Sequence, residues 1–298
     1  MIDFHHYITQ AKYYNETLTD SAIVTDGSVA GLSYSLYLQL DEPDHVVIVY
    51  HGGGVNRAAG YPILAQQLSS IPGVAVCLVD IRGHGESAGD RGKVEGPERI
   101  WEDVDTLLGE INHRFPQARK HLFGHSSGAG MLLNYLTRYP FRQHADSLIM
   151  LAPELGPFAR IAPATSITKS FAKVRKWPFI INAMSGGLLF GQYPAIRLNF
   201  PDSVLATTPG LISKYSVNMA NALTPRHPDQ QLAELPLPTL FLAAGRDELF
   251  SAQSLADFVS RHGNDRLRFR LLENSTHLDC IFSACQEIRQ YLTIVTQL

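Results

Sequence analysis

One serine lies at the centre of a five-residue pattern that is typical of a catalytic nucleophile. Residues 124–128 read Gly-His-Ser-Ser-Gly and match G-x-S-x-G, with Ser126 in the middle. In this pattern the serine sits on a sharp turn between a strand and a helix, where its hydroxyl can reach a substrate. The alternative is a glycine-rich turn in which Ser126 only caps the helix that follows. Because the pattern is short, its context must decide between the two.

A serine hydroxyl needs a base to take its proton, and a carboxylate commonly orients that base. Two polar residues downstream of Ser126 follow apolar runs. Asp247 comes after the run at 240–244, and His277 lies in the loop after the run at 268–272. We therefore predict His277 as the base and Asp247 as the orienting acid. Glu154 is the alternative acid and a candidate for contacting the substrate.

Glycines after the apolar run at 46–50 predict a site for a negatively charged oxygen. The run continues as His51-Gly52-Gly53-Gly54, and glycines let backbone amides approach an oxyanion without obstruction by side chains. We assign the amides of Gly53 and Ser127 as the two donors, with Gly54 as the alternative to Gly53. His51 and Gly54 are also expected to contact the substrate. The histidines outside these motifs lack the paired spacing of metal ligands, so no metal site is predicted.

These residues must be positioned by a sheet whose strands alternate with helices. Continuous apolar runs indicate strands that are buried on both faces, and helical periodicity between them indicates a doubly wound, mostly parallel α/β sheet. The polar–apolar alternation at 33–40 predicts an antiparallel strand, paired with residues 22–25. The expected parallel strands lie at residues 46–50, 74–79, 121–123, 148–151, 239–242 and 268–272.

The stretch between the runs at 148–151 and 239–242 breaks this rhythm. It is rich in proline and scattered aromatic residues, and some 75 residues are too many for a bare loop. We predict that residues 153–228 form an inserted helical cap over the sheet. Residues 1–152 and 229–298 then form the α/β core.

Composition excludes several classes of protein. The chain has 298 residues, a formal net charge of −3 and only three cysteines, which indicates neither a basic nucleic-acid-binding surface nor a disulfide framework. No apolar run is long enough to span a membrane, and the N-terminus lacks the pattern of a secretory signal. We expect a cytoplasmic monomer or homodimer that acts on a small molecule without a metal or organic cofactor.

Together with the segment Arg82-Gly83-His84-Gly85-Glu86-Ser87, these motifs resemble the α/β-hydrolase superfamily, and most of all its monoacylglycerol lipase and lysophospholipase-like branch. The resemblance extends from about residue 46 to the C-terminus and is weakest in the cap. It implies a Ser-His-Asp hydrolase without a cofactor, carried here by Ser126, His277 and Asp247. Ser127 departs from that branch, which often has methionine at this position.

The leading hypothesis is the hydrolysis of a carboxylic ester with a small-molecule acyl substrate through an acyl-enzyme on Ser126, with His277 as base and Asp247 as orienting acid. The same residues could cleave a thioester, an amide or peptide, a lactone or a carbon–carbon bond, or transfer the acyl group to an alcohol. A non-catalytic binding protein on this scaffold is the remaining alternative, since a fold does not imply an activity.

Overall fold

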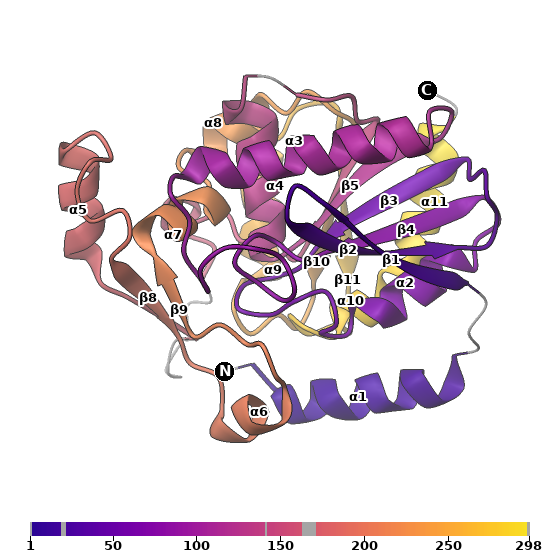
Figure 1. Ribbon diagram of the computed structural model, residues 1–298, viewed down its shortest axis with the longest axis horizontal. Helices are drawn as coiled ribbons and strands as arrows, with labels where there is room; N and C mark the ends of the chain where they lie inside the picture. The colour runs from indigo at the N-terminus through magenta and orange to yellow at the C-terminus, as the bar shows by residue number, and fades with distance from the viewer. Residues whose placement is uncertain (1, 19–21, 141, 163–170, 297–298) are drawn as a thin grey trace.

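A large mixed sheet forms the centre of the computed structural model, which describes residues 2–18, 22–140, 142–162 and 171–296 (Figure 1). Its strands run in the order β1-β2-β4-β3-β5-β6-β10-β11. The strands are β1 (Ile23–Val29), β2 (Leu32–Leu38), β3 (His45–Tyr50), β4 (Val74–Val79), β5 (Arg119–His125), β6 (Ser147–Leu151), β10 (Thr239–Ala244) and β11 (Leu267–Leu272). The prediction of a mostly parallel α/β sheet is confirmed.

Only β2 runs against its neighbours in this sheet. It pairs antiparallel with β1 and β4, whereas the remaining pairs from β4 to β11 are parallel. The β1–β2 turn places Ala30 and Gly31 at φ values of 49° and 81°, as a two-residue hairpin requires. The central strand β4 is buried along its whole length, which explains its unbroken apolar sequence.

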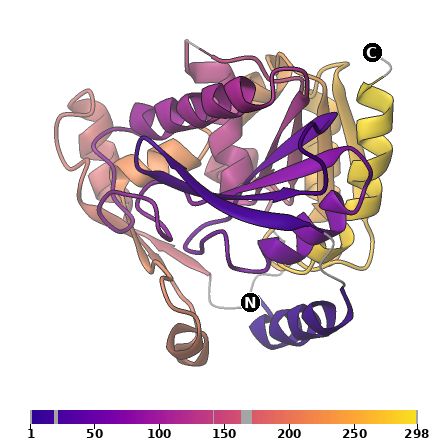
Figure 2. The same ribbon diagram turned by 45° about the vertical axis from the view of Figure 1, so that its right-hand side comes forward.

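Helices cover both faces of the sheet and divide the core into two clusters (Figure 2). One cluster contains buried side chains of α3 (Pro97–Arg114), α4 (Ser127–Arg138) and α9 (Ala252–His262). The other contains side chains of α2 (Tyr61–Ser69), α10 (Cys280–Ser283) and α11 (Cys285–Val295). Within the described ranges no helix combines the length and apolar character needed to cross a bilayer.

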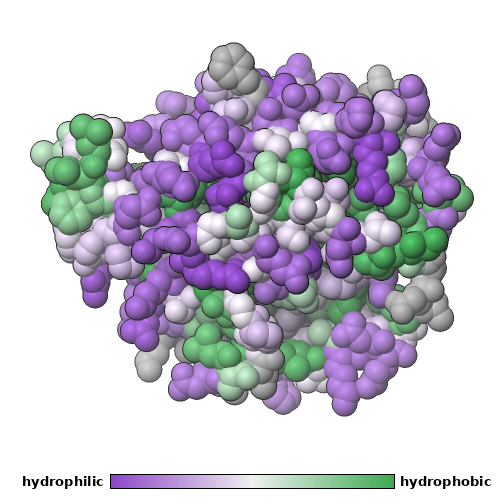
Figure 3. Space-filling view, viewed as in Figure 1, coloured by the Kyte–Doolittle hydropathy of each residue, from purple (hydrophilic) through white to green (hydrophobic). Residues whose placement is uncertain are grey.

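The segment between β6 and β10 carries both helices and a small sheet of its own. The expectation of helices alone was therefore incomplete, because β7, β8 and β9 form a three-stranded antiparallel sheet there. The α5 helix stands away from the core, and its apolar side chains form a hydrophobic patch at the edge of the molecule (Figures 1 and 3). The elements are η1 (Pro157–Ala159), β7 (Ala172–Val174), α5 (Lys176–Met184), β8 (Pro194–Leu198), α6 (Asp202–Thr207), β9 (Lys214–Ser216) and α7 (Val217–Leu223), followed by α8 (Pro228–Ala233).

An N-terminal helix that the sequence patterns did not predict, α1 (Phe4–Thr17), packs along the edge of the core (Figure 1). None of its residues is buried, so it lacks the clear apolar stripe by which sequence periodicity reveals a helix. It is anchored by a few contacts. Tyr7 stacks on Phe282 with ring centroids 5.2 Å apart, and Phe4 packs against Phe171 and Phe200 of the inserted segment.

Two helical glycines differ in the space around them. A Cβ on Gly128 in α4 would lie 2.5 Å from the carbonyl oxygen of Tyr50 and 2.6 Å from that of His51, both of them backbone atoms. A Cβ on Gly109 in α3 would meet only the Gln143 side chain, at 3.7 Å or more. Close contact between α4 and the end of β3 therefore requires glycine at position 128 but not at position 109.

We expect Gly128→Ala to lower the free energy of unfolding by about 1–3 kcal/mol or more, because the backbone of α4 must move away from β3. The matched variant Gly109→Ala should be neutral or stabilising by up to about 1 kcal/mol, because alanine is the better helix former. Urea unfolding measures both. Equal effects of the two substitutions would contradict the close contact at Gly128.

Candidate active site

Ser126 lies on the turn that joins β5 to α4. Its φ of 52° and ψ of −118° are unusual for a serine, so the turn holds backbone strain. The turn is tight as well, because a Cβ on Gly124 would lie 2.4 Å from the backbone nitrogen of Ala129. The Ser126 amide donates a hydrogen bond to the Leu151 carbonyl at the end of β6 (2.9 Å), which holds the turn against the sheet.

The structure brings Ser126, His277 and Asp247 together at the carboxyl ends of the parallel strands. His277 Nε2 lies 3.0 Å from Ser126 Oγ, and His277 Nδ1 lies 2.8 Å from Asp247 Oδ2. A carboxylate only accepts hydrogen bonds, so Nδ1 carries the imidazole proton and Nε2 is free to accept one from the serine. Asp247 Oδ1 accepts the amides of Leu249 and Phe250, which fix the carboxylate. This arrangement can withdraw a proton from the serine hydroxyl.

Glu154, the alternative acid, is not the hydrogen-bond partner of the His277 imidazole, whose Nδ1 bonds Asp247. Its Oε1 accepts the amide of Gly156 at 2.7 Å, and its Oε2 accepts the hydroxyl of Thr224 at 3.2 Å. Burial raises the pKa of the Glu154 carboxyl above its usual value. Oε1 thus holds the local turn, and Oε2 joins the chain after β6 to the end of the inserted segment. The contact of Glu154 with substrate stays a prediction.

The glycine turn after β3 has one free amide between two occupied ones. The Gly52 amide donates to the hydroxyl of Tyr61 (2.7 Å), and the Gly54 amide donates to that of Tyr215 (2.5 Å). In the described part of the chain the Gly53 amide has no such partner. Since Gly54 is occupied, Gly53 is the better placed of the two donors considered from the sequence. The second proposed donor, the Ser127 amide, belongs to the first residue of α4, where helix amides lack partners.

Each of the two tyrosine hydroxyls donates a hydrogen bond to a buried histidine. His125 Nε2 donates to the His277 carbonyl (2.9 Å), so its Nδ1 accepts the Tyr61 hydroxyl (2.8 Å). His84 Nδ1 donates to the Arg82 carbonyl (3.1 Å), so its Nε2 accepts the hydroxyl of Tyr215 (2.7 Å). Burial lowers the pKa of both histidines to about 3, which keeps them neutral and able to accept.

The His51 side chain is buried and helps to hold the glycine turn in place. Its Nδ1 donates to the Gly52 carbonyl (2.8 Å), and its Nε2 accepts the Ile81 amide (3.1 Å). The side chain is 1% exposed, and burial lowers its pKa to about 4. Gly54 is covered by the inserted segment, because a Cβ there would lie 2.6 Å from the Leu198 side chain. The polar groups of both residues are bonded within the protein, and their contact with substrate stays a prediction.

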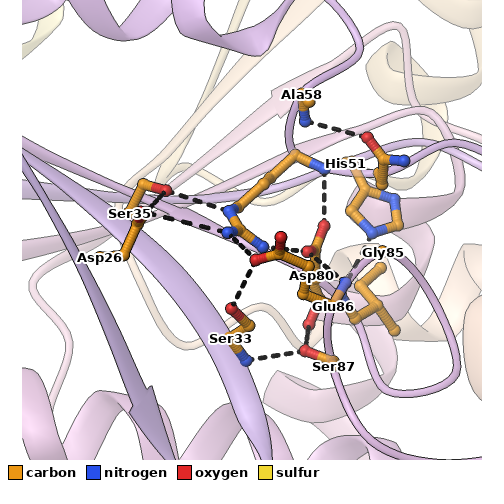
Figure 4. Close-up of polar contacts among 12 residues, drawn as sticks. Asp26, Ser33, Ser35, His51, Ala58, Asp80, Gly85, Glu86 and Ser87 are labelled. Atoms are coloured by element: carbon orange, nitrogen blue, oxygen red, sulfur yellow. Dashed lines mark hydrogen bonds and ion pairs between the residues drawn. The ribbon is translucent and has the colours of Figure 1, made fainter. Parts of the chain in front are cut away.

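A buried ion pair holds the segment after the glycine turn. The Asp80 carboxylate contacts the Arg57 guanidinium and also accepts the amides of Arg57 (2.8 Å) and Glu86 (2.9 Å). Figure 4 shows Asp80 and Glu86 close together, and the Glu86 carboxylate pairs with the same guanidinium. Asp80 is 1% exposed, and these donors satisfy its carboxylate oxygens. The network joins the glycine turn to the segment after β4.

Four supporting residues were not identified from the sequence. Tyr61 and Tyr215 belong to no motif, and Arg57 follows the glycines without a recognisable pattern. His125 lies inside the G-x-S-x-G pattern, but that position accepts any residue. Nothing in the sequence indicates that Tyr215, in the inserted segment, meets a glycine turn 161 residues away. His84 belongs to the segment at residues 82–87, which contributes to the family resemblance.

Comparisons with known proteins agree on one family. A family model described as serine aminopeptidase, S33, matches residues 41–279. A monoacylglycerol lipase of Mycolicibacterium smegmatis is 28% identical over 142 residues, which are 47% of this chain and 49% of that protein. The chain thus spans about half the length of this relative. A monoglyceride lipase of Rattus norvegicus is 21% identical over 239 residues, covering 79% of this chain and 76% of that protein.

Solved structures share the fold at lower sequence identity. A soluble variant of the monoglyceride lipase from Saccharomyces cerevisiae superposes with a TM-score of 0.67 at 15% identity, covering 93% of this chain and 96% of that one. A monoacylglycerol lipase from Paleococcus ferrophilus superposes with a TM-score of 0.61 at 17% identity, covering 89% and 99%.

The two tyrosine relays predict a stability effect. Tyr61→Phe and Tyr215→Phe should each lower the free energy of unfolding by about 1–3 kcal/mol, because each leaves a buried glycine amide unpaired. Tyr50→Phe is the control. The Tyr50 hydroxyl is buried with no hydrogen-bond partner among the described residues, so its removal should be neutral or stabilising. If Tyr50→Phe lowers the free energy of unfolding as much as the other two substitutions do, the hydrogen bonds from the glycine amides to the two tyrosines do not stabilise the fold.

The buried histidines also predict a pH dependence. His51, His84 and His125 have lowered pKa values, so below about pH 6.5 the unfolded chain binds protons that the folded chain does not. The free energy of unfolding should therefore fall as the pH is lowered from 7 toward 4, by about 1.4 kcal/mol per pH unit for each histidine. Urea unfolding of His84→Gln should show a smaller pH slope. His144→Gln, which alters an exposed histidine, should keep the original slope. Identical slopes for both variants would contradict the assignment.

Proposed function

Because the chain belongs to the serine aminopeptidase S33 family of α/β-hydrolases and is a serine hydrolase, we propose that it cleaves a carboxylic ester through an acyl-enzyme on Ser126. The observation that carries this proposal is the unbroken chain of contacts from Ser126 Oγ to His277 (3.0 Å) and from His277 to Asp247 (2.8 Å). The names of the two lipase relatives support an ester of the lipid type as the substrate.

In the first half of the reaction, Ser126 Oγ attacks the acyl carbon and His277 Nε2 takes the hydroxyl proton. Asp247 stabilises the imidazolium that forms. The negative oxygen of the tetrahedral intermediate is held by the amides of Gly53 and Ser127. When the intermediate collapses, the bond to the alcohol breaks and His277 returns the proton to the leaving oxygen. Water then repeats the sequence on the acyl-enzyme and releases the acid.

We propose residues 153–228 as a cap on a core formed by residues 1–152 and 229–298. Two buried apolar side chains support an apolar acyl group, because Leu198 and Phe200 lie within 3 Å of the Cβ position of Gly54. The backbone amide of Ile212 holds the same segment to the Gly54 carbonyl. These residues place the hydrocarbon surface of the inserted segment against the glycine turn.

Cleavage of a peptide from its N-terminus is the other activity that the family description suggests. Such an enzyme needs an anionic group to hold the substrate's ammonium, because a charge is costly to bury unpaired. Glu154 is the acidic residue that follows β6 beside the serine turn, and its two oxygens are bonded to Gly156 and Thr224. This favours an uncharged acyl group and therefore the ester.

A fluorophosphonate probe, which modifies activated serines, tests the proposal. We expect covalent labelling of the wild-type protein and none of Ser126→Ala, whose ester turnover should fall on the order of 10⁶-fold. Asp247→Asn should lower turnover by about 10⁴-fold, because it holds the wrong imidazole tautomer. Glu154→Gln should cost less than about tenfold. p-Nitrophenyl esters from acetyl to palmitoyl and an aminoacyl p-nitroanilide compare the substrate classes.

Absence of labelling in a folded wild-type protein would overturn the acyl-enzyme. Faster turnover of the anilide than of every ester would overturn the ester assignment and favour the peptide. A larger loss in Glu154→Gln than in Asp247→Asn would exchange the roles of the two acids.

A further inference from the structure

The side chain of Ser127 carries a hydroxyl with nothing to bond to. Its Oγ is inaccessible to solvent and has no hydrogen-bond partner among the described residues. A serine inside a helix can bond the carbonyl four residues earlier, but Ser127 is the first residue of α4 and that carbonyl belongs to β5. Burying an unpaired hydroxyl destabilises the folded chain, so this group calls for an explanation.

The position of the Ser127 hydroxyl relates it to the glycine turn. Its Oγ lies 3.2 Å from the point where a Cβ on Gly53 would stand, closer than any other atom outside the turn. The Ser127 hydroxyl therefore lies beside Gly53, whose amide is assigned to the oxyanion together with that of Ser127. The Tyr215 hydroxyl, which lies 3.8 Å from the same point, is already bonded to Gly54 and His84.

We propose that the Ser127 hydroxyl is a third donor to the oxyanion, beside the amides of Gly53 and Ser127, an inference that rests on the proposed ester hydrolysis. The amides of Gly52 and Gly54 cannot fill this role, because Tyr61 and Tyr215 occupy them. A third donor would therefore come from a side chain. Ser127 provides a hydroxyl beside Gly53 that has no hydrogen-bond partner among the described residues.

An unpaired donor suits this task for an energetic reason. A group that is already bonded in the resting enzyme would have to give up that bond to stabilise the intermediate. The Ser127 hydroxyl gives up nothing, so its hydrogen bond forms only when the negative charge develops. Interactions that strengthen in the transition state raise the rate of the chemical step and leave substrate affinity unchanged. Ser127 is not a second nucleophile, because His277 Nε2 contacts the hydroxyl of Ser126.

Ser127→Ala tests this role, because it removes the hydroxyl and keeps the amide. We expect kcat for a p-nitrophenyl ester, and the rate of labelling by a fluorophosphonate, to fall about tenfold or more, short of the 10²–10³-fold loss of a principal donor. KM should change little. The melting temperature should stay level or rise, because the unpaired hydroxyl is gone. Ser127→Thr, which retains a hydroxyl, should recover most of the rate.

A trifluoromethyl ketone gives a readout that a structural role would not affect. It forms a negatively charged tetrahedral adduct on the serine, so Ser127→Ala should weaken its binding about as much as it lowers kcat. Tyr50→Phe, which removes another unpaired buried hydroxyl, is the control and should raise stability without changing kcat.

The inference is overturned if Ser127→Ala keeps kcat and ketone affinity within twofold of wild type, or if its activity falls together with its melting temperature. The proposed function fails in a different way, since the wild-type protein would then not be labelled at all. Labelling of the wild type and of Ser127→Ala at equal rates would leave the ester hydrolase standing and remove only the third donor.

Discussion

The hydrogen bond between the Nδ1 proton of His277 and the Asp247 carboxylate joins two loops that follow different strands, β10 and β11. It holds the imidazole in the one tautomer that leaves Nε2 facing Ser126. The carboxylate is itself held by two backbone amides of its own turn, and its side chain is fully buried. An imidazole with the other tautomer would present a proton to the serine and could not accept one.

A second constraint is the set of hydrogen bonds that holds the glycine turn at residues 52–54 in place. Two of its three amides are bonded to tyrosine hydroxyls, and only the Gly53 amide is left without such a partner among the described residues. These tyrosines come from α2 and from the inserted segment, and each is fixed by a neutral histidine. The His125 relay ends on the carbonyl of His277, so the supports of the base and of the glycine turn are physically connected.

The inserted segment therefore takes part in holding the glycine turn. Its strand β9 supplies Tyr215, and the nearby Ile212 amide donates to the Gly54 carbonyl, so both polar groups of Gly54 are bonded to this segment. The N-terminal helix adds contacts to the same region through Phe4, and Asp3 donates its amide to Glu248 beside the acid. Parts of the chain that are distant in sequence thus meet around one turn.

The sequence by itself determined the sheet and the candidate site residues at its edge, because both have local signatures. Apolar runs mark the buried strands. Because the residues that follow those runs reach the same edge of a parallel sheet, the sequence predicts that Ser126, Asp247 and His277 lie close together. Only the tertiary structure decided which donors and acids are free. Glu154 and Gly54 have suitable types and positions, but their polar atoms are used by Thr224 and Tyr215. The reason is that a hydrogen bond between distant residues depends on distances that no local pattern records, and the same holds for α1, whose few anchoring contacts leave no periodic stripe.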